Sequence, residues 1–237
     1  MFLKILELEE VKSWDAGILA AIIALLGTLL VNIATNIVTI IQNKKARKDN
    51  NNKIKRLDID AEKKLYVKKL NNFYIPLRHY LENSKTLFKI FLKDKPTGFR
   101  TLTYLLKPNQ KYNHHKVKLD KNDKALLDRI FKIGLDMEKL ILKNGYLAGD
   151  DPEFVENYIP KKEYSHIPYE KDMTLLSLLI SHLTVIRMAY KADLSGQMGK
   201  FKGFVFPNEI NPRVEEKIKE LQGLISECET KMNSLLK

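Results

Sequence analysis

The chain has 237 residues, of which 44% are hydrophobic and 30% charged, and 41 Lys and Arg against 29 Asp and Glu give it a net charge of +12. This composition excludes collagen-like, low-complexity and disordered classes, and the length suits one or two domains. The single cysteine, Cys228, excludes an internal disulfide and a paired-thiolate metal site, as is usual in reducing compartments.

A long uncharged segment begins after the first fifteen residues. Residues 16–41 carry no charged side chain. A helix of that length, roughly 39 Å at about 1.5 Å per residue, exceeds the hydrocarbon core of about 30 Å. We therefore expect residues 16–42 to form a transmembrane helix. Because residues 1–15 are acidic rather than basic, we expect no signal-peptide cleavage. Their apolar side chains, with Trp14 at the headgroup boundary, predict an interfacial location for this segment.

Basic side chains gather directly after the apolar segment. Lys44, Lys45, Arg47 and Lys48 begin a longer basic cluster, whereas the N-terminal flank holds only two lysines. Because flanking segments rich in Lys and Arg stay on the cytoplasmic side, we expect residues 43–237 to be cytoplasmic and the N-terminus to be outside. This basic collar also suits anionic lipid headgroups, and nucleic-acid binding is its alternative role.

Small and polar residues form a stripe along one side of the expected membrane helix. At about 100° per residue they fall near one direction on the helical wheel, opposite a side of leucine and isoleucine. The stripe consists of Gly17, Ala21, Ala24, Thr28, Asn32, Thr35, Asn36 and Thr39. Because an unpaired amide in hydrocarbon is costly, we expect the stripe to face another copy of the chain in a homo-oligomer. Two arrangements remain open, a packed helix interface and a ring whose stripe lines a pore.

The remaining residues predict a mainly α protein, with one N-terminal transmembrane helix followed by a cytoplasmic helical bundle. Residues 43–72 are expected to form a basic juxtamembrane helix or linker, and residues 73–237 the helical domain. The asparagines at 50–52 suggest a break, and Pro76 suggests a kink or a helix start. Further helices are expected at residues 73–95, 120–144, 170–192 and from about 212 onward. The helix at 170–192 is apolar on nearly all sides and is therefore expected to be central. Between the helices we expect a strand or short helix at 99–106, an irregular stretch at 146–169 and a packed loop or short edge strand at 201–206.

The sequence contains none of the familiar catalytic signatures. A Gly-rich phosphate loop, a paired-cysteine zinc motif, a nucleophile elbow and a zinc-protease helix are all missing from it. We therefore expect no catalytic residue, no metal site and no cofactor. The adjacent His114 and His115 have no carboxylate or thiol cluster near them in sequence, which makes them poor metal ligands.

Two pairs of polar residues are candidates for a ligand or partner contact. Arg78 and His79 offer groups that bind a nucleotide or RNA, and helix packing is the competing interpretation. His182 and Arg187 lie five residues apart on the expected central helix. We expect both to be polar groups satisfied within its packing, with ligand sensing or catalysis as the alternative.

The plan of one N-terminal span, a basic collar and a compact helical domain without a catalytic motif resembles the small membrane effectors of bacterial antiviral systems. It is particularly similar to the pore-forming accessory proteins of type VI-B CRISPR systems, whose cytoplasmic part is related to HEPN domains. HEPN ribonucleases carry an Arg followed five positions later by His, and no arginine of this sequence has a His at that offset. The missing motif argues against ribonuclease activity.

The resemblance implies a homo-oligomer in the bacterial inner membrane that permeabilises or depolarises it and slows the growth of an infected cell. Its partners would be the lipid bilayer, other copies of the chain, and a nucleotide, RNA or protein trigger on the cytoplasmic side. The alternative function is a membrane-tethered helical binding module or adaptor that recruits a cytoplasmic protein or RNA.

Overall fold

The computed structural model divides the chain into two compact units. An N-terminal unit ends at Ile59, and a helical unit runs from Asp60 to Lys237. The boundary falls within the segment 43–72 that the sequence marks as a juxtamembrane helix or linker. The structure describes residues 16–107, 111–112, 115–149, 151–156, 173–194 and 206–235, so the expected interfacial segment 1–15 lies outside the described residues.

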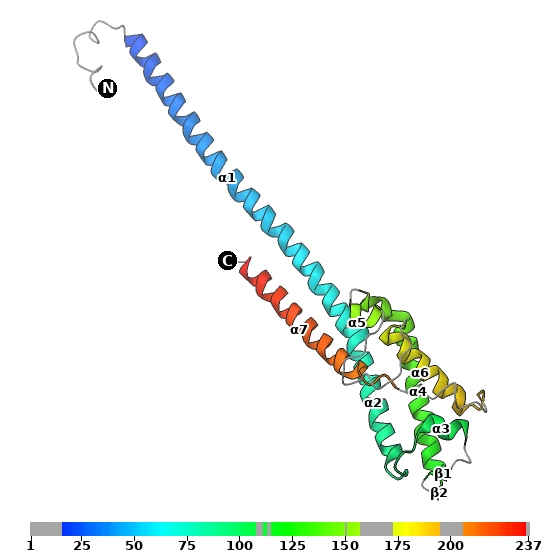
Figure 1. Ribbon diagram of the computed structural model, residues 1–237. Helices are drawn as coiled ribbons and strands as arrows, with labels where there is room; N and C mark the ends of the chain where they lie inside the picture. The colour runs from blue at the N-terminus through cyan, green and yellow to red at the C-terminus, as the bar shows by residue number, and fades with distance from the viewer. Residues whose placement is uncertain are drawn as a thin grey trace. The chain divides into compact units, whose positions relative to one another are not determined.

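Helix α1 (Ala16–Lys69) contains the expected membrane segment (Figure 1). Its apolar part is exposed at every described side chain, and by length and composition it is a candidate membrane span. The three asparagines at 50–52 do not break the helix, contrary to expectation. In a helix interior an Asn costs less than about 0.7 kcal/mol relative to Ala, and the Lys and Arg on either side are good helix formers.

A π-helical turn, η3 (Leu70–Tyr74), connects α1 to α2 (Ile75–Leu92). It lies directly before Pro76, which has no backbone N–H for the carbonyl of residue 72. The side-chain amide of Asn144 donates a hydrogen bond of 2.8 Å to that carbonyl. The irregularity expected at Pro76 is thus a π-helical turn directly before it. The backbone carbonyl that Pro76 leaves without an N–H donor accepts its hydrogen bond from Asn144 of another helix instead.

Three long helices pack with α2 in the helical unit. They are α4 (Lys121–Asn144), α6 (Leu175–Tyr190) and α7 (Ile210–Ser234). Helix α4 runs alongside α2, and α6 and α7 each pack against this pair (Figure 1). The ends of α4 and α6 follow local capping rules, because Asp120 and Thr174 accept hydrogen bonds from the backbone N–H groups of Asp123 and Ser177.

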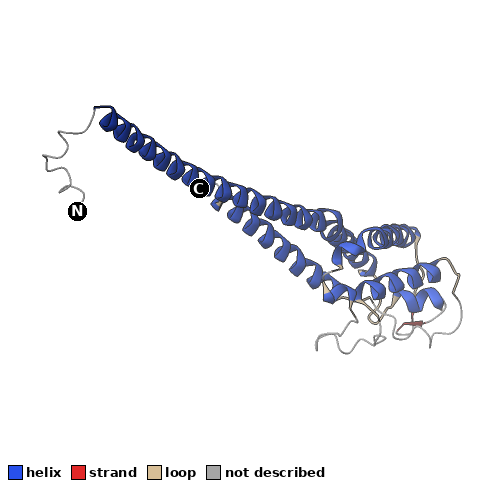
Figure 2. Cartoon of the chain, turned by 90° about the horizontal axis from the view of Figure 1, so that it is seen from above, coloured by secondary structure: helices blue, strands red, loops and turns tan. Residues whose placement is uncertain are grey.

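The remaining described elements are short. They are α3 (Thr101–Leu106), a 3₁₀ turn η4 (Gly145–Ala148), α5 (Pro152–Val155) and the two-residue strands β1 (Lys111–Tyr112) and β2 (His115–Lys116), which pair antiparallel. Helix predominates strongly among the described elements (Figure 2). The segment 99–106 is therefore mostly helical, and most of η4 and all of α5 fall in the stretch 146–169, for which the sequence predicts irregular structure. Residues 201–205 of the expected loop or edge strand lie outside the described residues, and Phe206 is not in a strand.

Two groups of apolar side chains hold the helical unit together. The larger joins η3, α2, α4, α6 and α7 around fully buried residues such as Phe73, Leu77, Met137 and Leu179. The smaller lies at the other end of α2 and centres on Phe91, Leu127 and Phe131. Helix α6 buries mainly one side and leaves Met188 exposed, so it is less enclosed than its apolar sequence suggested.

Candidate functional site

The stripe on the candidate membrane span lies on one unbroken helix, and its threonines are satisfied within that helix. The hydroxyls of Thr28 and Thr35 each donate a hydrogen bond of 2.8 Å to the carbonyl four residues earlier, and Thr39 makes the equivalent bond at 2.9 Å. A hydroxyl that bonds to its own helix can lie in a lipid environment without another partner. The threonines therefore do not by themselves require a neighbouring helix.

The two asparagines of the stripe differ from the threonines. Asn32 and Asn36 are exposed and lie one turn apart, and neither side-chain amide has a hydrogen-bond partner among the described residues. In hydrocarbon, each amide leaves donors and an acceptor unsatisfied unless another helix or water supplies partners. The side-chain hydrogen-bonding groups of the stripe that need an external partner are thus those of these two residues, one turn apart.

The basic collar likewise forms no ion pair or side-chain hydrogen bond within the described part of the chain. Lys44, Lys45, Arg47 and Lys48 are helical and exposed, and none of them forms an ion pair there. Their charges are available to an external partner, and anionic lipid headgroups at a membrane surface are well matched to them.

Arg78 and His79 lie next to each other on α2 but not in a common site. The guanidinium of Arg78 lies 3.8 Å from a carboxylate oxygen of Glu215 on α7, whereas His79 is exposed. The structure thus places Arg78 in the contact between α2 and α7. It does not combine Arg78 and His79 into one binding surface.

His182 and Arg187 on α6 have different environments. Arg187 forms an ion pair with the buried Glu138 of α4, which also accepts a hydrogen bond from Thr184. This is the packing role expected for Arg187. His182 departs from the expectation, because its Nδ1 is buried and has no hydrogen-bond partner within the part of the chain that the structure describes. Its ring instead meets Phe206 edge-on, with ring centroids 5.5 Å apart.

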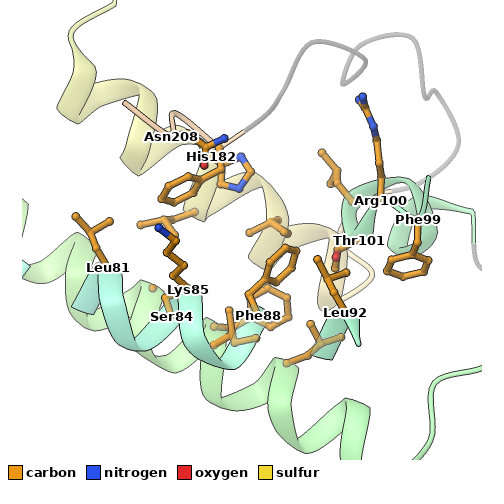
Figure 3. Close-up of a pocket in the computed structure, with 18 of the residues that line it drawn as sticks. Leu81, Ser84, Lys85, Phe88, Leu92, Phe99, Arg100, Thr101, His182 and Asn208 are labelled. Carbon is orange, nitrogen blue, oxygen red and sulfur yellow. The ribbon is translucent and has the colours of Figure 1, made fainter. Parts of the chain in front are cut away.

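A cavity of about 610 Å³ lies beside His182. Figure 3 shows its walls, which come from α2, α3, α4, α6 and the start of α7 with the residues just before it. The lining is mostly leucine, isoleucine and phenylalanine, and Gly134 of α4 allows the close approach of Leu183 from α6. A cavity of this size and composition is typical of sites for small organic molecules, which occupy about 300–1,000 Å³.

Polar side chains form a minority of the lining, and two of them have a buried atom with no hydrogen-bond partner among the described residues. These atoms are His182 Nδ1 and the hydroxyl oxygen of Thr101 at the start of α3. Leaving such a group unsatisfied costs about 1–3 kcal/mol. A ligand able to bond to either group would recover part of that free energy.

Two side chains at or near the cavity, His182 and Tyr190, have displaced pKa values. Burial lowers the pKa of His182 from 6.5 to about 4, so its imidazole is neutral at pH 7. Partial burial and the hydrogen bond that its hydroxyl donates to Asp128 raise the pKa of Tyr190 to about 12. The described lining contains no Asp, Glu or Cys that could act with His182 as a catalytic pair.

Metal binding finds no support among the described residues. They contain no group of three or more His, Cys, Asp or Glu side chains placed to hold an ion. His115 belongs to β2, whereas His114 lies outside the described residues, so the structure does not test their pairing.

Sequence reasoning found His182 but not the cavity around it. Lys85, Phe88 and Thr101 line the same space, although nothing in the sequence connects α2 with α3 and α6 at this point. The one available signal was a histidine within an apolar helix.

No protein-family model, curated protein or solved structure matches the chain.

Proposed function

We propose that this chain is a homo-oligomeric single-pass membrane effector that permeabilises or depolarises the membrane in which it lies. The observation that carries the proposal is the pair of exposed amides at Asn32 and Asn36, one turn apart on an otherwise apolar helix and without a partner in the described chain. Apolar residues alone suffice for an anchor. Two amides at helical spacing are explained by contact with other copies or with water.

Each interhelical hydrogen bond from such an amide contributes about 0.6–2 kcal/mol in a membrane. A dimer or trimer would bury the stripe between helices, whereas a larger ring would turn it toward a water-filled lumen. Permeabilisation requires the ring. A function in bacterial antiviral defence extends this proposal and is supported by the similarity of architecture alone.

The first test combines oligomer size with flux. We expect the purified full-length chain to form a homo-oligomer in detergent and to release ions or a small dye from liposomes. Replacing both amides with leucine (Asn32→Leu with Asn36→Leu) removes the polar contacts while retaining apolar volume. This change should reduce the oligomer size measured by light scattering and lower flux at least tenfold, which corresponds to about 1.4 kcal/mol.

The matched control substitutes the opposite side of the same helix. Ile33→Leu with Ile37→Leu keeps the span equally apolar and should leave size and flux unchanged. A monomeric wild-type chain would contradict the proposal. So would intact liposomes and an unchanged membrane potential in expressing cells. Flux that survives the asparagine substitutions would place the pore lining elsewhere.

A second prediction concerns orientation. Because the basic collar follows the span, we propose that the helical unit lies in the cytoplasm of a bacterial cell and the N-terminus outside. Protease added to intact spheroplasts should leave residues 60–237 uncut, and lysis should expose them to cleavage. Digestion of the helical unit before lysis would reverse the proposed topology.

A membrane-tethered binding module is the second candidate function. It is favoured by the cavity beside His182, which a pore does not require. Absence of flux together with specific binding at the cavity would support this module over the effector.

A further inference from the structure

The lining of the cavity beside His182 defines the chemistry that a ligand would need to bind there. Its volume of about 610 Å³ is bordered by five separate parts of the helical unit, so its shape depends on their packing. Phe88, Phe131 and Phe206 lie among its lining residues and provide apolar and aromatic surface. The body of a matching ligand is therefore apolar.

Two buried polar groups indicate that the ligand also carries a hydrogen-bonding group. His182 Nδ1 and the hydroxyl of Thr101 are both buried and have no hydrogen-bond partner among the described residues. His182 lies among the cavity's lining residues on α6, and its partly buried imidazole is neutral at pH 7. A neutral imidazole can donate or accept a hydrogen bond, and so can a hydroxyl.

The charge of the lining determines the sign of the ligand's polar group. Lys85 and Arg100 are the charged residues of the described lining, which contains no carboxylate. Lys85 extends from α2 toward the α6 wall that carries His182, whereas Arg100 points away from His182 on the side of α3 (Figure 3). Lys85 forms no ion pair within the described chain, so its ammonium is available to a ligand.

We propose that this cavity binds a small amphipathic acid, with an acyl or aromatic body among the phenylalanines and one acidic head group near Lys85 and His182. One nearby ammonium matches a single carboxylate or phosphate and is insufficient for the several phosphates of an oligonucleotide. This site does not depend on the proposed pore. A fatty acid and a monoalkyl phosphate share the required chemistry.

The test uses the full-length chain in lipid nanodiscs and a hexadecanoic acid that carries a photoreactive diazirine in its chain. After irradiation, mass spectrometry locates the labelled peptides, which separates binding in the cavity from partition into the bilayer. We expect labels in peptides of α2, α4 and α6 that line the cavity. Labelling confined to residues 16–42 would show partition into the bilayer without binding in the cavity and would overturn the proposal.

Competition identifies the head group. Dodecanoate and dodecyl phosphate represent the two acidic sources, and dodecanol and dodecylamine provide the same chain without the negative charge. We expect at least one acid to displace the cavity label at a concentration about tenfold lower than the alcohol or the amine, because a hydrogen bond to a charged group is stronger than a neutral one. The more effective acid identifies the source. Equal competition by the amine would contradict the proposal.

Lys85→Met supplies the matched variant, because it keeps an apolar chain of similar length at an exposed position. It should weaken competition by the preferred acid about tenfold and leave competition by dodecanol unchanged. Lys89→Met, one turn further along α2 and outside the described lining, should behave as wild type. Equal effects of the two substitutions would show that general surface charge, and not a site at Lys85, attracts the acid.

Discussion

Replacing Asp123 with alanine is expected to lower the free energy of unfolding of the helical unit by about 3–5 kcal/mol, because it leaves a buried cation without its partner. The ammonium of Lys95 donates hydrogen bonds of 2.7 and 2.8 Å to the two carboxylate oxygens of Asp123. Both side chains are nearly inaccessible, with exposed fractions of 7% for Lys95 and 11% for Asp123. Hydrogen exchange of the α4 amides in nanodiscs measures the change.

Asp123 has a second role that the controls must separate. Its carboxylate accepts a hydrogen bond from the N–H of Asp120, and the side chain of Asp120 accepts one from the N–H of Asp123, which completes a capping box at the start of α4. Asp120→Ala removes the cap but keeps the buried ion pair. It should cost only about 1 kcal/mol.

Two further variants test the electrostatic explanation. Asp136→Ala breaks an exposed pair with Lys139 on the same helix and should change stability by less than about 1 kcal/mol. The double change Lys95→Met with Asp123→Leu replaces the buried pair with apolar side chains and should recover most of the loss. If the double variant is as unstable as Asp123→Ala, the buried unpaired cation is not the cause.

The parts of the fold that local chemistry determines were predictable from sequence. The apolar run from residue 16 predicted a long helix, which the structure contains as part of α1 and which is a candidate membrane span by length and composition. Helix α4 was expected at 120–144 and occupies Lys121–Asn144, with Asp120 as its cap. Both features depend on residues that are close together in the chain, so periodicity and capping rules apply directly.

The parts that depend on contacts between distant residues were not predictable. The π-turn before Pro76 is satisfied by Asn144, which lies 72 positions from residue 72. Arg187 and Glu138 are 49 positions apart. Helical periodicity relates only residues close in sequence, so it could not predict the partner of Arg187. The cavity combines five regions of the helical unit and has no linear motif. The missing partner of His182 likewise depends on the packing around α6.

The helical unit is expected to lose about 3 kcal/mol of stability through His182 when the pH falls from 7.5 to below 4. Burial lowers the pKa of His182 from 6.5 to about 4 in the folded chain. Above pH 6.5 the imidazole is neutral in both states and contributes no pH dependence. Between pH 6.5 and 4 the unfolded chain binds a proton that the folded chain does not, so stability falls. A difference of about 2.5 pH units corresponds to about 3 kcal/mol at 1.36 kcal/mol per unit.

His182→Asn isolates this contribution from the carboxylates that titrate in the same range. The amide keeps a neutral polar group at the position but does not bind a proton. The variant should match wild type to within about 1 kcal/mol at pH 7.5 and be about 2–3 kcal/mol more stable than wild type at pH 4.5. His79→Asn makes the same change at an exposed histidine of the same unit and serves as the matched control for the substitution itself. Parallel pH profiles for wild type and His182→Asn would show that the His182 imidazole accepts its proton as readily in the folded chain as in the unfolded one. They would therefore show that the burial of His182 beside the cavity does not disfavour its charged form.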